Sequence, residues 1–560
     1  MLNPIEADKI SVMLPIPLKP AIGNTFEYRL LKNLELSLGD FVVVPFGSRS
    51  IIGVVWGEST GQCSDDKLKY ISHKLDCAPL PKVSRQFVEW VARYTISSAG
   101  AVLKMVMSVP DALKPPKKII VYKIETIPDD LCFTPARKRV LTLLKNGPPK
   151  IAADIIREAS VSPSVVKGLI KAGTLIALES APERVNFEYN LNYENSGLKL
   201  SKDQTKASDI LENTTEAARF SVILLDGVPG SGKTEVYFQA IAKALKMGGQ
   251  VLVLLPEISL SAQWLARFKI RFGGDPVEWH SELTPFRRRQ TWRAVSEGTA
   301  RVVVGARSAL FLPFSNLKLI IADEEHDTSF KQEEGVIYNA RDMAVVRAQL
   351  GSIPIVLASA TPALETLINV ENGRYQIIQL PDRYGTAEPP VIETIDMRYE
   401  KMNRQCWISP TLQEALKETF SEKEQAMLFL NRRGYAPLTL CRTCGHRLKC
   451  PRCTAWLVEH RHIKQLQCHH CGYNALIPNI CPDCNDEDSF AACGPGVERL
   501  AEEVTSLFPD IRTIIVASDN ITGPKAAAEF VRQIEEREVD LIIGTQIVAK
   551  GYHFPMLTLV

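Results

Sequence analysis

Four Cys-x-x-Cys pairs between residues 441 and 484 have a spacing that is typical of zinc binding. Two such turns complete one tetrahedral Zn²⁺ shell, so eight cysteines predict two Zn²⁺ ions. Disulfides or reduced core cysteines are the alternative, but the opening residues show no secretory signal, which predicts a reducing cytoplasm. All-cysteine shells leave no open position for a catalytic water, so both sites should be structural. The pairs are Cys441/Cys444, Cys450/Cys453, Cys468/Cys471 and Cys481/Cys484.

A second pattern predicts phosphate binding. The sequence GVPGSGKT at 227–234 follows a short apolar run and precedes a stretch with helical apolar spacing. Strand, glycine loop and helix together are the context of a P-loop that binds ATP. Its backbone N–H groups would surround the phosphates, with the lysine on the β- and γ-phosphates and the threonine on Mg²⁺. The expected nucleotide contacts are Gly227, Gly230, Ser231, Gly232, Lys233 and Thr234.

Acidic residues follow a second apolar run, at 319–322. Asp323 at the end of this strand is placed to hold Mg²⁺, and Glu324 is the natural base to orient an attacking water. Solvated turn residues are the alternative, which the P-loop upstream disfavours. We therefore expect Lys233, Asp323 and Glu324 to be the catalytic residues of an ATP hydrolase.

These residues need a scaffold of parallel strands. Apolar runs alternate with helical stretches along the chain, which predicts parallel sheets flanked by helices, in two lobes. Polar blocks end several of the runs, where open α/β sheets bind their ligands. The further strands are expected at 251–255, 301–304, 353–357, 426–430, 511–516 and 540–543.

The composition is that of an ordinary multidomain protein, with 560 residues, 45% hydrophobic and 23% charged. No apolar run is long enough to predict a membrane span. The formal charge of +2 becomes −2 when eight thiolates and two Zn²⁺ are counted, so nucleic-acid binding requires local patches. One patch surrounds the zinc turns, where its cations either bind DNA or offset the anionic shells: Arg442, His446, Arg447, Lys449, Arg452, Arg461 and Lys464.

The first third of the chain is interpreted as two small modules. Apolar and polar positions alternate within residues 1–110, which predicts a small β-barrel-like module. Three helices at 136–145, 151–159 and 163–172, with a strand at 174–178, predict a winged helix. Winged helices contact DNA or pack against protein, and both alternatives remain open. A polar linker is expected at 188–198.

Together these motifs resemble those of superfamily 2 helicases, and more narrowly those of the bacterial primosomal replication-restart helicases, the PriA (primosomal protein N′) family. The zinc pairs lie between the fourth and fifth helicase motifs, as in that family, and the resemblance covers essentially the whole chain. The shared strings are GVPGSGKTEVY at 227–237, LPEI at 255–258, DEEHD at 323–327 with FKQ at 330–332, SATP at 359–362, NRRGY at 431–435, and GTQ at 544–546 with AKG at 549–551 and HFP at 553–555.

The resemblance implies a multidomain α/β fold with a β-rich N-terminal 3′-end DNA-binding domain, a winged helix, and two RecA-like lobes, the second with a two-zinc insertion. The corresponding ranges are 1–112, 126–186, 198–390, 391–560 and 438–487. It implies an ATP-, Mg²⁺- and Zn²⁺-dependent, cytoplasmic, monomeric DNA helicase that unwinds 3′-to-5′ and restarts replication at stalled or abandoned forks. Its partners would be forked and single-stranded DNA, other primosome and helicase-loading proteins, and single-strand DNA-binding protein.

The resemblance also implies roles for single residues. Gln204 would read adenine, and His326 would help couple the motifs. A loop from Phe330 to Arg341 would couple DNA to ATP through Phe330, Lys331, Tyr338 and Arg341, although a buried Phe and a surface Tyr explain the same letters. A pocket for a DNA 3′ end would comprise Phe26, Glu27, Gly47 and Lys69, with Glu27 where the family commonly has Asp. The zinc sites would be Cys441/Cys444/Cys481/Cys484 and Cys450/Cys453/Cys468/Cys471, a nested pairing that spacing alone does not distinguish from a sequential one.

The chain departs from the family pattern near its end. An arginine-rich motif and a C-terminal domain are expected in the family and are not found before Val560, so we expect a form that is C-terminally truncated relative to the family. One alternative is a protein that binds fork DNA and nucleotide with little or no unwinding, because an arginine finger is missing. Another zinc-bearing helicase, such as a restriction-type translocase, is a further alternative, but it does not explain the N-terminal module.

Overall fold

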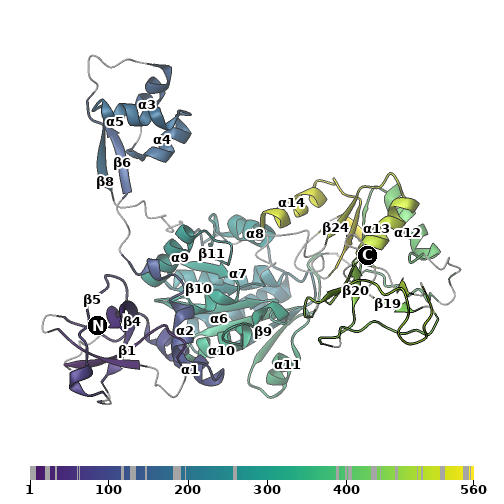
Figure 1. Cartoon of the computed structure of the whole chain (residues 1–560), viewed down its shortest axis with the longest axis horizontal. Helices are drawn as coiled ribbons and strands as arrows, with labels where there is room; N and C mark the ends of the chain where they lie inside the picture. Colours follow the sequence, from purple (N-terminus) through teal and green to yellow (C-terminus); the bar gives the residue numbers. More distant parts are fainter. Residues whose placement is uncertain are drawn as a thin grey trace. The chain divides into compact units, whose positions relative to one another are not determined.

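The chain divides into two compact units in the computed structural model (Figure 1). The first comprises Met1–Gly227, Lys233–Leu254 and Gly273–Leu380, and the second comprises Val228–Gly232, Leu255–Phe272 and Pro381–Val560. The structure describes residues 8–18, 25–31, 34–59, 61, 63–114, 119–126, 134–145, 148–180, 191–195, 197–256, 262–385, 390–397, 400, 406–430, 438–441, 443–453, 455–460, 465–468, 470–487, 490–493, 496–516, 524–545, 554 and 556–560.

A seven-stranded parallel sheet, in the order β11-β12-β10-β13-β16-β9-β17, is the centre of the first unit. Its inner strands are runs of Val, Ile and Leu because helices bury both faces of a parallel sheet. The strands predicted in this region are confirmed, and the edge strands β11 and β17 were not predicted. The bounds are β9 (Ser221–Gly227), β10 (Gln250–Leu254), β11 (Val277–Trp279), β12 (Val302–Gly305), β13 (Leu317–Asp323), β16 (Pro354–Ser359) and β17 (Gln376–Leu380).

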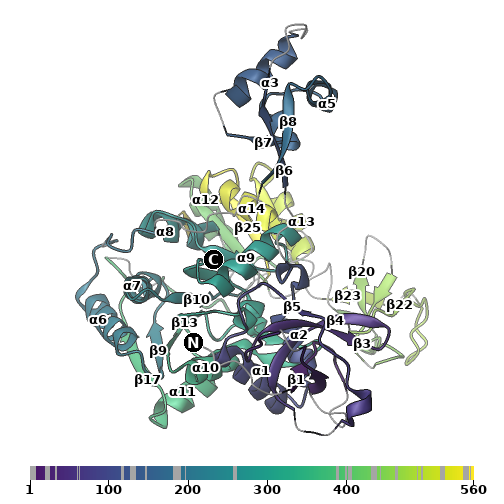
Figure 2. The ribbon, with the colours of Figure 1, turned by 90° about the vertical axis from the view of Figure 1, so that its left-hand side faces the viewer.

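Helices cover both faces of this sheet. Figure 2 shows α6 (Lys202–Ala217) and α7 (Lys233–Lys246) on one side of the strands and α10 (Ala340–Gly351) on the other. The remaining elements of this region are α9 (Pro285–Glu297), α11 (Leu364–Glu371) and the two-stranded β14 (Lys331–Gln332) and β15 (Tyr338–Asn339). Because the strands are parallel, the residues that follow β9, β13 and β16 meet at one edge of the sheet.

The N-terminal module is an antiparallel sheet in the order β2-β1-β4-β3-β5. The segment after residue 68 joins its two ends, because the Arg29 N–H donates to Lys69 O and the Ser72 N–H donates to Val43 O (2.9 Å each). The predicted barrel-like character is therefore confirmed. The strands are β1 (Lys9–Met13), β2 (Thr25–Arg29), β3 (Phe41–Phe46), β4 (Arg49–Glu58) and β5 (His73–Lys74).

Two helices that were not predicted join this module to the lobe built on the seven-stranded sheet, α1 (Lys82–Tyr94) and α2 (Ala99–Val106). Phe87 on α1 packs 5.3 Å from the Phe311 ring, measured between centroids. The Trp292 indole N–H of the lobe donates to Val106 O of α2 (2.9 Å). The two domains therefore share one hydrophobic core.

The winged helix is confirmed as a separate small fold. A three-stranded antiparallel sheet, in the order β7-β6-β8, supports three helices around their own buried core. Strands β6 and β7 were not predicted, and part of the predicted linker at 188–198 lies outside the described residues. The elements are β6 (Ile119–Ile124), α3 (Pro135–Lys145), β7 (Lys150–Ile151), α4 (Ala152–Glu158), α5 (Pro163–Lys171) and β8 (Leu175–Ser180).

The second unit contains a four-stranded parallel sheet, in the order β24-β25-β18-β26. Its elements are α8 (Ala262–Phe272), α12 (Pro410–Ser421), β18 (Gln425–Phe429), α13 (Val497–Leu507), β24 (Thr513–Val516), α14 (Pro524–Glu535), β25 (Leu541–Gly544) and β26 (Leu557–Leu559). The predicted motif NRRGY at 431–435 lies outside the described residues, as do parts of those at 255–258, 544–551 and 553–555.

Short antiparallel strands form a zinc module within the second unit. Strand β19 (Leu438–Cys441) pairs with β23 (Phe490–Cys493), and β21 (Gln465–Gln467) lies between β20 (Val458–His460) and β22 (Asn474–Ala475). Throughout the described part of the chain, every helix is too short or too polar to cross a membrane.

Candidate active site and zinc sites

The P-loop connects the end of β9 to the start of α7. Gly230 and Gly232 have φ angles of 81° and 79°, a left-handed conformation that glycine adopts without steric cost. The helix begins at Lys233, whose Nζ donates to the carbonyl of Gly227 (2.7 Å). The N-terminus of a helix offers free N–H groups and a partial positive charge, so this geometry suits a phosphate.

Two acidic residues at the end of β13 complete the site. Burial raises the pKa of Glu324 to about 7, the Asp323 carboxylate adds to this rise, and Lys233 opposes it. Burial lowers the pKa of Lys233, against the opposing effect of Glu324 and Asp323. The structure thus brings together the three residues predicted to be catalytic, in an environment where their charges depend on one another.

Tyr237 is a site residue that was not predicted to have a role. Its hydroxyl donates to Asp323 Oδ2 (2.7 Å), while the Glu324 N–H donates to Oδ1 (3.1 Å). Tyr237 is fully buried on α7, one turn after Thr234. It fixes the orientation of the Asp323 carboxylate. The sequence signal was a polar-tipped aromatic within an otherwise apolar helical face.

Glu325 forms a buried hub beside the site. Its carboxylate pairs with the Arg341 guanidinium (3.2 Å) and accepts from the Ala363 N–H (2.7 Å) and the Thr366 hydroxyl (3.0 Å). The Glu325 side chain is 0% exposed and that of Arg341 is 9% exposed. The acidic motif is therefore tied to the start of α10 and to the start of α11.

His326 provides a second link between motifs. Its Nδ1 lies 2.8 Å from the hydroxyl oxygen of Ser359, which also accepts from the Thr361 N–H (3.0 Å). The acidic motif after β13 and the SATP motif after β16 are thus joined by side-chain hydrogen bonds. This arrangement is compatible with the coupling role that the resemblance implies for His326.

Phe330 and Arg341 are buried in this structure, and their DNA contacts stay a prediction. Phe330 is 1% exposed, and Arg341 is held by Glu325 rather than open to a phosphate. Tyr338 is also buried and packs edge-on against Phe311 (5.3 Å between centroids), so the alternative of a surface Tyr is wrong. Both aromatic side chains, Phe330 and Tyr338, belong to the hydrophobic core that the two domains share. Lys331 is exposed and remains a candidate contact.

The Gln204 side chain is buried and hydrogen-bonded at the start of α6. The side-chain oxygen of Gln204 accepts from the backbone N–H of Ser201 (2.9 Å), and the backbone N–H of Gln204 donates to the Ser201 hydroxyl (3.3 Å). This reciprocal pair is a capping box, which stabilises the beginning of a helix. The structure therefore gives Gln204 a structural role, and adenine reading stays a prediction.

The eight cysteines form two groups of four. In each group the Sγ atoms all lie within 4.8 Å of one another. The closest Sγ–Sγ distances are 3.5 Å for Cys441–Cys484 and 3.4 Å for Cys453–Cys468. Zinc–sulfur bonds of about 2.3 Å require sulfur atoms about 3.8 Å apart in a tetrahedron, so both groups fit Zn²⁺. The groups are Cys441/Cys444/Cys481/Cys484 and Cys450/Cys453/Cys468/Cys471, the nested pairing that the resemblance implies.

The predicted 3′-end residues lie near one end of the N-terminal sheet. Lys69 Nζ is 3.5 Å from the carbonyl of Gly47, and Phe26 packs edge-on against Phe46 (5.1 Å between centroids). The two carboxylate oxygens of Glu27 accept from the N–H groups of Gly61 (2.8 Å) and Cys63 (3.0 Å), and its role at a DNA 3′ end stays a prediction. In this structure Glu27 holds a neighbouring loop.

Comparison with known proteins places these sites in a family. Residues 11–108 match the 3′ DNA-binding domain of PriA, 201–370 match the DEAD/DEAH box helicase domain, and 450–475 match the Cys-rich region of PriA DNA helicase. The replication restart protein PriA of Rickettsia felis is 38% identical over 536 residues, which span 95% of this chain and 71% of the relative. This chain belongs to the PriA family. The PriA of Haemophilus influenzae is 36% identical over 99% of this chain and 76% of its own length.

The matched segments of the PriA family lie inside the predicted domains. The 3′ DNA-binding match falls within 1–112, the helicase match within 198–390, and the Cys-rich match within 438–487. The chain is thus a helicase of the replication-restart class, with DNA-binding and zinc-binding domains. A solved structure of RecG bound to a three-way DNA junction is similar over 65% of this chain and 39% of the RecG chain, with a TM-score of 0.39 and 16% sequence identity.

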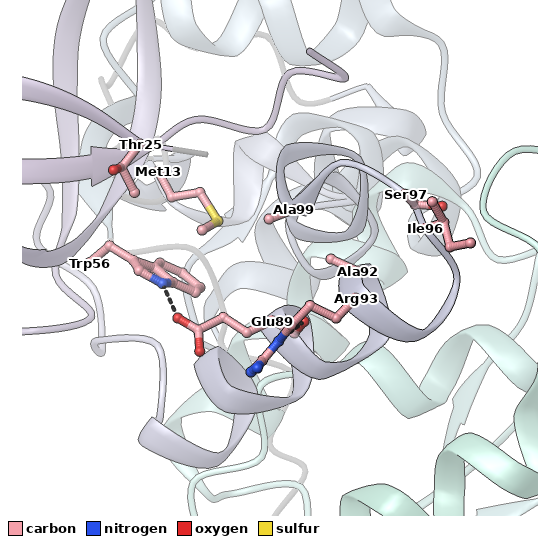
Figure 3. A pocket seen from close by; sticks show the side chains of 9 residues that line it. All are labelled: Met13, Thr25, Trp56, Glu89, Ala92, Arg93, Ile96, Ser97 and Ala99. Carbon is pink, nitrogen blue, oxygen red and sulfur yellow. Dashed lines mark hydrogen bonds between the residues drawn. The ribbon is translucent and has the colours of Figure 1, made fainter. Parts of the chain in front are cut away.

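A hollow of about 430 Å³ lies between the PriA-type N-terminal sheet and helices α1 and α2 (Figure 3). The Trp56 indole N–H donates to the Glu89 carboxylate at its wall (2.6 Å). None of the four predicted 3′-end residues lines it. The lining residues are Met13, Thr25, Trp56, Glu89, Ala92, Arg93, Ile96, Ser97 and Ala99.

Arg341→Leu is expected to destabilise this PriA family member substantially. The substitution leaves the Glu325 carboxylate buried without its cationic partner, and breaking a buried ion pair on one side costs about 3–5 kcal/mol. The free energy of unfolding in urea measures the loss. Asp342→Asn is the matched control, because Asp342 also contacts Arg341 but is 47% exposed. Equal stability of the two variants would contradict the hub role of Glu325.

Proposed function

We propose that this protein is an ATP-dependent 3′-to-5′ DNA helicase that recognises stalled or abandoned replication forks and initiates replication restart. The observation that carries the proposal is the core shared by the ATPase lobe and the PriA-type 3′ DNA-binding domain. An ATPase site and a DNA-end domain that pack as one body allow end recognition and ATP turnover to influence each other.

In the proposed ATPase cycle, the P-loop N–H groups and Lys233 bind the ATP phosphates. Thr234 and Asp323 would hold Mg²⁺, which neutralises phosphate charge when bound. Glu324 would orient and deprotonate the attacking water, which requires its carboxylate to be ionised. Tyr237 keeps Asp323 in position for the metal, and Gln204 would contact adenine.

The Glu325 and His326 contacts would carry the state of the nucleotide to the DNA-binding surface. Loss of the γ-phosphate would relax the acidic motif, and the bonds to Arg341 and Ser359 connect that motif to α10 and to the SATP segment. Lys331, exposed on β14, would then contact single-stranded DNA. The zinc module and the winged helix would add contacts to DNA or to partner proteins.

The proposed partners are forked and single-stranded DNA, single-strand DNA-binding protein, and other primosome and helicase-loading proteins. We further propose that the protein acts as a cytoplasmic monomer. The family membership supports the DNA partners most directly, since the matched N-terminal domain is a DNA-binding domain.

Lys69→Gln tests the proposed 3′-end pocket. Phe26, Gly47 and Lys69 would contact the last nucleotide of a leading strand, and removing the lysine charge should weaken fork binding roughly tenfold. Fluorescence anisotropy would compare forks whose leading strand ends at the junction with forks that lack this strand. Only the first kind should be affected.

Lys67→Gln is the control for this experiment, because Lys67 is exposed two residues away and is expected to have no role in the pocket. The pocket assignment is wrong if Lys67→Gln and Lys69→Gln weaken binding equally, or if both fork types lose affinity to the same extent.

A further inference from the structure

An exposed indole lies beside two cations on the zinc module. Trp456 is 43% exposed. The Arg447 guanidinium carbon lies 5.4 Å from the centre of its ring, and the Lys449 Nζ lies 5.3 Å from it. Cation–π attraction is favourable at both distances. These three residues are named the tryptophan platform.

The fold of the inner zinc site produces this arrangement. Lys449 and Trp456 are bridge partners in an antiparallel pair, and the Leu457 N–H donates to Leu448 O (3.0 Å). Side chains alternate along extended backbone, so residues 447 and 449 share the face of Trp456. Leu448 and Leu457 are 9% and 5% exposed and point into the module. The platform is therefore held by the backbone that carries Cys450.

A second cation–aromatic pair joins the two turns of the same zinc site, with Arg452 between Cys450 and Cys453 and Tyr473 two residues after Cys471. The Arg452 guanidinium lies 5.2 Å from the centre of the Tyr473 ring. Within the described residues, Arg447, Lys449 and Arg452 make no ion pair with a carboxylate. The negative charge of a four-cysteine zinc shell would explain why cations lie here. That charge does not explain why a large aromatic side chain, Trp456, is exposed beside those cations.

We propose that the tryptophan platform binds single-stranded DNA, with a base stacked on Trp456 and adjacent phosphates on Arg447 and Lys449. Aromatic faces combined with cations are the general means of holding single strands. Duplex DNA fits less well, because its bases are already stacked on one another and cannot reach an indole face. The proposal rests on the proposed helicase function and deepens it by assigning a strand contact to the zinc module.

Photo-crosslinking tests the platform directly. The zinc-loaded full chain is irradiated with oligo(dT) that carries 5-iodouracil, and crosslinked peptides are identified by mass spectrometry. The expected crosslink is at Trp456. Trp456→Ala should remove it and weaken oligo(dT) binding roughly tenfold. Zinc content at two ions per chain verifies that the variant has kept its fold.

Salt dependence provides an independent measurement. Each phosphate contact to a single strand contributes about −0.7 to the slope of log K against log salt concentration. The double variant Arg447→Gln, Lys449→Gln should therefore make the slope less steep by about 1.4. Leu476→Ala is the control, because Leu476 is a 74% exposed apolar residue on the same module and carries no charge.

Three results would overturn the inference. One is crosslinking confined to the helicase lobes or the N-terminal module, with unchanged affinity in Trp456→Ala. Another is an unchanged salt slope in the double variant. The third is loss of binding to a fluorescent polyglutamate peptide, but not to DNA, in Trp456→Ala, which would identify an acidic protein as the ligand. The proposed helicase function fails separately, if the unmodified chain shows no ATP turnover that depends on DNA.

Discussion

Lys233→Ala is expected to abolish ATP hydrolysis while fork binding persists. Lys233 lies at the first residue of α7, beside Glu324 and Asp323, where it would neutralise charge on the β- and γ-phosphates. Removing one preorganised charge donor from an active site costs about 10²–10³ in rate, and the loss of a full charge in a buried site should be at the upper end or beyond. Phosphate release in the presence of forked DNA measures the rate, and anisotropy measures binding.

Lys246→Ala is the control, because Lys246 is exposed at the other end of the same helix. It should hydrolyse ATP at the rate of the unmodified protein. Normal turnover in Lys233→Ala would refute the P-loop assignment. Loss of fork binding together with turnover would show instead that the substitution disrupts the shared core.

Cys468→Ser is expected to remove one zinc ion and to unfold the inner half of the zinc module. Structural zinc sites of this kind contribute about 10–16 kcal/mol of apparent binding free energy, and without the ion such small modules have too little apolar core to fold. Among the described residues of the module, five buried residues form its own cluster, and two of these are the zinc ligands Cys450 and Cys468. Metal analysis should fall from two zinc ions per chain to one.

The unfolding is visible in two ways. The fluorescence of Trp456, which lies in the inner half, should shift, and limited proteolysis should cut within residues 447–475. Cys406→Ser is the control, because Cys406 is half-buried and belongs to neither group of four. Retention of two zinc ions in Cys468→Ser would contradict the assignment of this ligand, as would loss of zinc in Cys406→Ser.

Prediction from the sequence succeeded best for sites whose residues are close together in the chain. The P-loop and the acidic motif each need one strand and the turn that follows it, so their residue types and spacing were sufficient. The zinc ligands were also predictable as pairs. Grouping the pairs was not, because it depends on which turns the fold brings together, and the nested pairing came from the family resemblance.

Features that depend on distant parts of the chain were missed. Helices α1 and α2 bury their apolar faces against the ATPase lobe, through contacts such as Trp292 with Val106, and no local pattern indicates that partner. The burial of Phe330 and Arg341 was also not predicted, because aromatic and basic residues suit a DNA contact equally well. Phe330 lies in the hydrophobic core that the two domains share, and Arg341 pairs with the buried Glu325.

The direction of unwinding tests the proposed helicase function most directly. A labelled duplex with a single-stranded tail on one end is mixed with the protein and ATP, once with a 3′ tail and once with a 5′ tail. The proposed 3′-to-5′ helicase should release the strand, with ATP, from the substrate with the 3′ tail alone, and Lys233→Ala should release none. Release from the 5′-tailed substrate alone, or ATP turnover with no release from either substrate, would contradict it.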